Sequence, residues 1–210
     1  MKGMCVRVIR NLVFVVAFVV CTRAACASDA YSIKSLSKAL AALASDVDPT
    51  EAELASETAH TTARSLKIKY HVVLNPEFQC FLINVGLRKR GWCGHWTRDI
   101  GERLKELKLK TLVLHWGVAY DGTSSENNCV VVTARNQPFQ DGIILDGWRR
   151  GGRLFWCAVK KDDEYELEQH YGHSGITAWK EKMVYTAWLQ DYRHAYEFEP
   201  PARKVQPGLR

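Results

Sequence analysis

The hydrophobic pattern of this chain changes its period near residue 110, and that change constrains the fold more than any other feature. Before it, apolar residues recur at helical spacing, and Asp48-Pro49-Thr50-Glu51 is typical of a helix start, with proline at the first helical position. The segments predicted to be helical are 33–44, 49 to about 66, 76 to about 88 and 97 to about 108. The stretch 67–74 is rich in β-forming residues and predicts either a short strand or an extended connector.

After residue 110 the chain consists of short strand-like runs separated by turn signals such as Asp121-Gly122 and Gly151-Gly152. The predicted strands are 111–120, 128–134, 142–146 and 153–159. Short loops between consecutive strands favour an antiparallel meander. Helices followed by strands predict an α+β fold, here N-terminal helices followed by an antiparallel sheet. Further on, residues 177–192 are predicted to form one more helix, and 201–210 a loose tail.

The first 27 residues have the pattern of an export signal. Lys2, Arg7 and Arg10 precede an unbroken apolar run over 12–20, and Ala25-Cys26-Ala27 offers a cleavage site. The run is shorter than the about 20 residues that a spanning helix needs. We therefore expect a periplasmic or secreted protein. The alternatives are a retained membrane anchor and a lipoprotein that is lipid-anchored at the cell envelope through Cys21 or Cys26. Without such an anchor we expect no membrane association.

Removing residues 1–27 takes away four of the 29 Lys and Arg and none of the 23 Asp and Glu, which leaves 25 against 23. With a net charge of about +2, the mature chain gives no electrostatic reason to expect a nucleic-acid partner. Residues 28–200 suffice for a single α+β domain with a hydrophobic core. Within it, 28–90 is the helical part, 91–160 contains a cysteine-bearing helix and the strands, and 161–200 is mixed. The sequence does not indicate an oligomeric state.

Four cysteines lie outside the signal: Cys80, Cys93, Cys129 and Cys157. In an oxidising compartment they could form two disulfides in any of three pairings. No CxxC or His/Cys cluster has the spacing of a zinc site, so we predict neither a metal nor a cofactor.

Cys93 is the best candidate for chemistry. It belongs to Gly91-Trp92-Cys93-Gly94-His95-Trp96, which leads into the helix predicted at 97–108 and places the thiol in its first turn. Unpaired backbone N–H groups and the helix dipole favour negative charge there, which predicts a lowered thiol pKa.

The order of elements around Cys93 resembles the core of transglutaminase-like and papain-like thiol enzymes, over about residues 91–150. In that pattern a cysteine opens a helix, a histidine begins the second strand and an aspartate ends the third. Gly91-Trp92-Cys93 matches the first position, and Asp146 in Ile144-Leu145-Asp146-Gly147 matches the third. The resemblance implies acyl transfer at an amide or ester, with Cys93 as nucleophile and Asp146 orienting the base.

The second position departs from the pattern, because Glu126-Asn127-Asn128-Cys129-Val130 holds asparagine where histidine is expected. An amide cannot take up a proton near neutral pH and cannot serve as general base. His115 on the preceding strand is the candidate replacement, although strand alternation turns it away from the heavier apolar face. His95 is the weaker candidate, and the structural alternative for both is a histidine bonded to backbone.

The asparagine at the histidine position leaves two hypotheses for the function of the chain. In the first, an exported thiol enzyme acts on peptide or peptidoglycan amides; His115 is its base, Asn127 or Asn128 binds the oxyanion, and His95 and Trp92 line the cleft. In the second, the chain is a catalytically inactive relative that serves as a binding or structural domain of the cell envelope. The substrate class rests on the fold analogy.

Overall fold

The structure is a computed structural model that describes residues 29–73, 75–121, 123, 125–163 and 179–181. The predicted export signal and the loose tail 201–210 lie outside these residues. So does the predicted helix 177–192, except for 179–181.

The first half of the described chain is helical, as the apolar spacing predicts. Residues 29–41 are helical, followed by α2 (Pro49–Lys69), α3 (Pro76–Asn84) and α4 (Cys93–Lys105). The predicted start of α2 is confirmed, because the Asp48 side chain accepts a hydrogen bond from the Thr50 N–H at 2.8 Å.

The strands form one antiparallel sheet in the order β4-β3-β2-β1-β5. Their bounds are Leu112–Ala119 for β1, Asn127–Ala134 for β2, Ile143–Asp146 for β3, Phe155–Ala158 for β4 and Trp179–Glu181 for β5. The α+β class and the predicted meander β1 to β4 are therefore confirmed.

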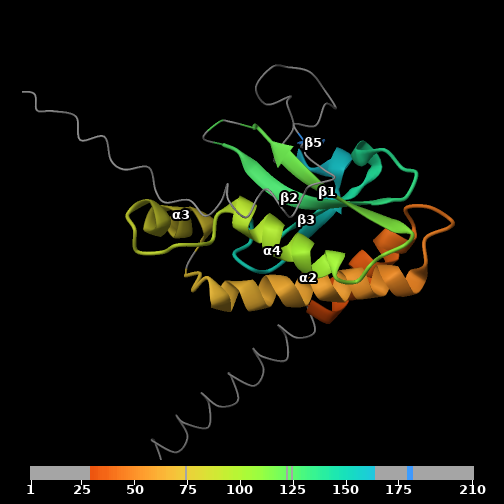
Figure 1. The fold of residues 1–210 in the computed structure, drawn as a ribbon, viewed down its shortest axis with the longest axis horizontal. Helices are drawn as coiled ribbons and strands as arrows, with labels where there is room; N and C mark the ends of the chain where they lie inside the picture. Colours follow the sequence, from red (N-terminus) through yellow and green to blue (C-terminus); the bar gives the residue numbers. More distant parts are fainter. Residues whose placement is uncertain (1–28, 74, 122, 124, 164–178, 182–210) are drawn as a thin grey trace, which may run out of the picture.

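Helix α4 covers one face of this sheet and lies between α2 and the strands, whereas α3 lies at one end of the molecule (Figure 1). The main core forms there from Trp96, Ile100 and Leu104 of α4 and from Val130 and Val132 of β2. Alanines face α4 from α2, at positions 52, 55, 59 and 63, and all are fully buried. Small side chains allow two helices to approach closely, so α2 packs tightly over the outer side of α4.

A smaller cluster lies on the opposite face of the sheet, where Cys129, Val131 and Ile144 pack with Phe139 and Val159. Because side chains alternate along a strand, β2 contributes to both clusters, and all of its residues are buried. The sheet therefore packs on both of its faces, and whether a residue has an odd or even position in its strand decides which of the two clusters it joins.

Three predicted boundaries are wrong for local reasons. Residues 67–69 continue α2 instead of starting a strand, since Leu66 and Tyr70 are buried one turn apart. The third helix ends at Asn84 and not near 88, because Gly86 takes a positive φ of 79° and the Leu87 N–H bonds back to Leu82. The fourth begins at Cys93 and not at 97.

The short strand β5 corrects one further prediction. Residues 179–181 were expected within a helix, but they pair with Gly117–Ala119 along the edge of β1. An open sheet edge presents unpaired N–H and C=O groups, and a passing extended segment satisfies them whatever its helical propensity.

Candidate functional site

Cys93 is the first residue of α4, and it lies half-buried against the start of β2. The Asn128 side-chain amide donates to Cys93 Sγ at 3.5 Å, and the thiol donates to the backbone carbonyl of Glu126 at 3.8 Å. The predicted meeting of a helix-opening cysteine with the second strand is thus present. The group that meets the sulfur is an amide and not an imidazole.

The thiol is held in its neutral form. Burial raises the pKa of the Cys93 thiol to about 11, and this outweighs the hydrogen bonds from Asn128 and from the Gly94 backbone, which lower it. The negative charge of Asp146 raises it further. With that pKa, roughly one thiol in ten thousand is ionised at pH 7. The lowered pKa expected from the helix dipole is therefore wrong, because burial is the larger effect.

Asn128 is fixed on every side. Its Nδ2 donates to the Glu126 carboxylate at 2.7 Å as well as to the thiol, and its Oδ1 accepts from the indole N–H of Trp116. Trp116 is fully buried and lies two positions along β1 from Val118, the residue that pairs with Asn128. An amide with all these bonds positions the thiol, but it has no capacity to accept a proton from it.

The neighbouring Asn127 makes the contact with the third predicted residue. Its Nδ2 donates to Asp146 Oδ2 at 2.8 Å, and both side chains are buried. Asn127 and Asp146 alternate with Asn128 and Leu145 along their strands, so they belong to the sheet face opposite α4. Asn128 therefore bonds the thiol on one side of the sheet, and Asn127 bonds the carboxylate on the other.

Asp146 is bound as a structural group. Its Oδ1 accepts from the backbone N–H groups of Trp148 and Arg149 at 2.8 and 2.9 Å, and the Arg149 guanidinium lies 3.4 Å from Oδ2. Burial raises the pKa of Asp146, although Arg149 and these N–H groups counteract it. The same guanidinium forms a bidentate pair with the fully buried Asp162 at 2.8 Å.

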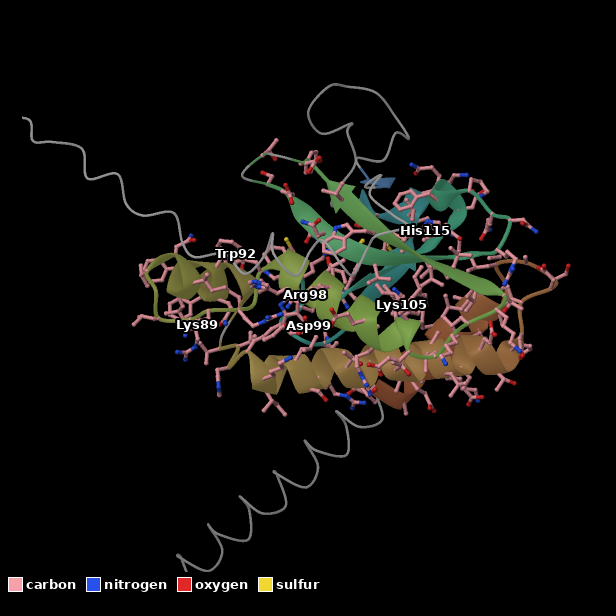
Figure 2. The ribbon with its side chains drawn as sticks, in the orientation of Figure 1. Lys89, Trp92, Arg98, Asp99, Lys105 and His115 are labelled. Carbon is pink, nitrogen blue, oxygen red and sulfur yellow. The ribbon has the colours of Figure 1, made fainter. Side chains whose placement is uncertain are left out.

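His115 does not reach the thiol. It lies between Leu114 and Trp116 on β1, and Trp116 faces Asn128, so alternation places His115 on the other face. There its Nε2 is 2.8 Å from Thr133 Oγ1 and its ring meets the edge of Phe139. Figure 2 shows His115 on the sheet, well apart from Trp92 at the start of α4. This placement removes His115 as the base for Cys93.

His95 organises the turn before α4. Its Nδ1 accepts from the backbone N–H groups of Gly91 and Trp92 at 3.1 and 3.3 Å, and its ring stacks against Trp92. The ring is buried and bonded to backbone, which matches the structural alternative for this residue. In this role His95 explains why α4 begins at Cys93, since it satisfies N–H groups that precede the first turn.

Two residues of the site were not identified from the sequence, Glu126 and Trp116. Trp116 lies near Asn128 through the pairing of β1 with β2, and the sequence alone does not fix that register. Glu126 lies two residues before Asn128 in the chain, so its closeness to Asn128 could have been inferred from the sequence. The disulfide alternative is also resolved for the described chain, in which Cys80, Cys93, Cys129 and Cys157 are all free thiols.

Within the described residues, none of the helices is both long and apolar enough to cross a membrane. Comparison of the chain with protein-family models, with curated proteins and with solved structures gave no match.

Proposed function

We propose that this chain is a catalytically inactive protein of transglutaminase-like build, exported to the cell envelope, where its thiol site binds a peptide or envelope amide without cleaving it. The observation that carries the proposal is the contact of Asn128, and not of a histidine, with the sulfur of Cys93. Of the two sequence hypotheses, the geometry favours the inactive one.

Acyl transfer by a cysteine needs a thiolate and a group that can return the proton to the leaving amine. The Cys93 site has a thiol with a raised pKa. Its described partners are the Asn128 amide and the Glu126 carbonyl, and neither exchanges a proton near pH 7. The site therefore holds a weak thiol donor, an amide and a carbonyl oxygen, groups that form hydrogen bonds to amides but do not take up a proton from the thiol.

The test is the pH dependence of alkylation at Cys93, followed by peptide mass spectrometry so that the other three cysteines are resolved separately. The wild-type protein is expected to label slowly below pH 9, because its thiolate is scarce there. A short cell-wall peptide is expected to slow the labelling and to be recovered intact. Rapid labelling at pH 6 to 7, or an acyl-enzyme formed with an activated ester, would overturn the proposal.

A pair of variants makes the test sharper. Asn128→His places an imidazole beside the sulfur, so it is expected to shift labelling towards neutral pH by forming an ion pair with the thiolate. Asn127→His is the matched control, because position 127 bonds Asp146 on the other face of the sheet. If Asn127→His activates the thiol and Asn128→His does not, the assignment of the two positions is wrong.

A further inference from the structure

One end of the molecule exposes an unusual concentration of apolar side chains. Of the eight large hydrophobic side chains that are exposed among the described residues, six fall between positions 68 and 87. We call these six the α3 patch: Ile68, Val73, Phe78, Phe81, Val85 and Leu87. The other two, Tyr31 and Leu54, lie in the first helical segment and near the start of α2. Scattered exposed apolar residues need no explanation, but a contiguous patch marks an interaction site.

The helix α3 has large apolar side chains on its outer side as well as on its buried side. Gln79 and Leu82 are buried towards the domain, whereas Phe78, Phe81 and Val85 are spaced to share the outer side, with Phe81 55% exposed. The rings of Phe78 and Phe81 stack with centroids 6.1 Å apart. A surface helix of a soluble domain normally turns polar residues outward, so this outer side is suited to a non-aqueous partner.

The patch is fixed to the domain. Gln79 Nε2 donates to the carbonyl of Tyr70 at the end of α2 and to the carbonyl of Arg90, both at 3.0 Å. This single amide joins α3 to the segments on either side of it. Ile68 and Val73, before α3, and Leu87, after it, are thereby held at the same end of the molecule, where α3 lies in Figure 1.

The segment that carries the patch is strongly basic. Segment 67–90 contains five basic residues and one acidic residue, Glu77, which gives a net charge of +4. The basic residues are Lys67, Lys69, Arg88, Lys89 and Arg90. Lys89 lies at the α3 end of the molecule, and Arg98 and Asp99 lie together further along, on α4 (Figure 2).

The nearest buried carboxylate does not cancel this charge. Asp99 pairs with Lys69 at 3.2 Å and with Arg90 and Arg98 at 2.9 Å each. One carboxylate shared among three cations leaves an excess of positive charge at the border of the patch. Two copies of the chain that met through this face would bring like charges together, which disfavours self-association.

We propose that the α3 patch docks the protein on an anionic lipid surface. Phe78, Phe81 and Leu87 enter the boundary between headgroups and acyl chains, and Arg88, Lys89 and Arg90 contact the anionic headgroups. In this arrangement the protein lies on the surface of the membrane and does not span it. The inference is independent of the chemistry at Cys93.

The experiment measures sedimentation of the full chain with phosphatidylglycerol vesicles and with phosphatidylcholine vesicles. Binding is expected to the anionic vesicles and to weaken with salt. Arg88→Gln with Lys89→Gln is expected to weaken it by about fivefold for each charge removed. Phe81→Glu with Leu87→Glu is expected to reduce it by about tenfold or more. The matched control is Tyr31→Glu with Leu54→Glu, which adds the same charge to exposed apolar positions elsewhere and is expected to leave binding unchanged.

Amide hydrogen exchange on the vesicles locates the contact, with protection expected in residues 76–90. Three outcomes would overturn the proposal. The first is equal binding to both vesicle types, and the second is protection from hydrogen exchange that is confined to residues 1–27. The third is a protein that does not bind vesicles but forms a dimer, which the Phe81 and Leu87 substitutions dissociate. The last would assign the face to a second copy of the chain. Circular dichroism of each variant confirms that the fold is retained, as expected for exposed positions.

Discussion

Replacing Arg149 with methionine is expected to destabilise the domain by about 3–5 kcal/mol, because it leaves two buried carboxylates without their cation. The Arg149 side chain is 6% exposed, and its partners Asp146 and Asp162 are 1% and 0% exposed. The guanidinium carbon lies 4.1 Å from the centroid of the Phe155 ring, and methionine keeps an unbranched side chain of comparable reach at this position. The change therefore removes the charge and its hydrogen bonds and leaves little cavity.

The magnitude can be checked by thermal unfolding. For a chain of this size, 1 kcal/mol shifts the midpoint by roughly 2–4 °C, so a loss near 4 kcal/mol predicts a fall of about 8–16 °C at pH 7. Arg150→Met is the matched control. Arg150 is exposed, although it also lies over Phe155, and its replacement is expected to cost no more than about 1 kcal/mol.

The pH dependence gives a second, independent signature. Burial already raises the pKa of Asp146 and Arg149 lowers it, so removing Arg149 raises that pKa further above its unfolded value. A group whose folded pKa is the higher one takes up its proton first in the folded state. The loss of unfolding free energy in Arg149→Met, relative to the wild type, is therefore expected to become smaller as the pH falls from 7 through the raised pKa of Asp146 towards about 4.

The reasoning about this ion pair is refuted if Arg149→Met and Arg150→Met unfold within about 1 kcal/mol of one another at pH 7. It is also refuted if the difference in unfolding free energy between the two variants does not become smaller at lower pH. Either result would mean that the two carboxylates find other partners at little cost.

Two further outcomes follow from the packing. His115→Gln is expected to leave the pH profile of Cys93 alkylation unchanged, since the ring lies on the opposite sheet face, and a shifted profile would return His115 to the site. Gly147→Ala is expected to lower the free energy of unfolding by about 1–3 kcal/mol, because its Cβ would lie 2.7 Å from Ile100 and 2.8 Å from Trp96. Urea denaturation measures this loss, and an unchanged midpoint would show that α4 can shift without cost.

Much of the fold could be predicted from the sequence because its signals are local. The Asp48 cap and Pro49 determined where α2 begins, and the turn residues separated the strands of the meander. Prediction was less accurate where a local preference competed with packing. The β-forming residues after Leu66 joined a helix because Leu66 and Tyr70 are both buried against the domain. Residues 179–181 became a strand because β1 had an open edge.

The candidate site was only partly predictable. The sequence placed Cys93 at a helix start and identified asparagine where a base was expected, and the structure brings Cys93 and Asn128 together. Strand alternation turns Asn127 and Asn128 to opposite faces of β2, but which of the two meets the sulfur depends on which face packs against α4. The placement of His115 depends on the same alternation, together with the register of β1 against β2.

The sequence by itself determined the order of helices and strands, the thiol at the start of a helix and the missing imidazole, because each depends on residues that are neighbours in the chain. Only the tertiary structure decided the protonation state of that thiol. A helix N-terminus favours the anion, whereas removal from water disfavours it, and the second effect prevails only once β2 and its fixed asparagine cover the sulfur.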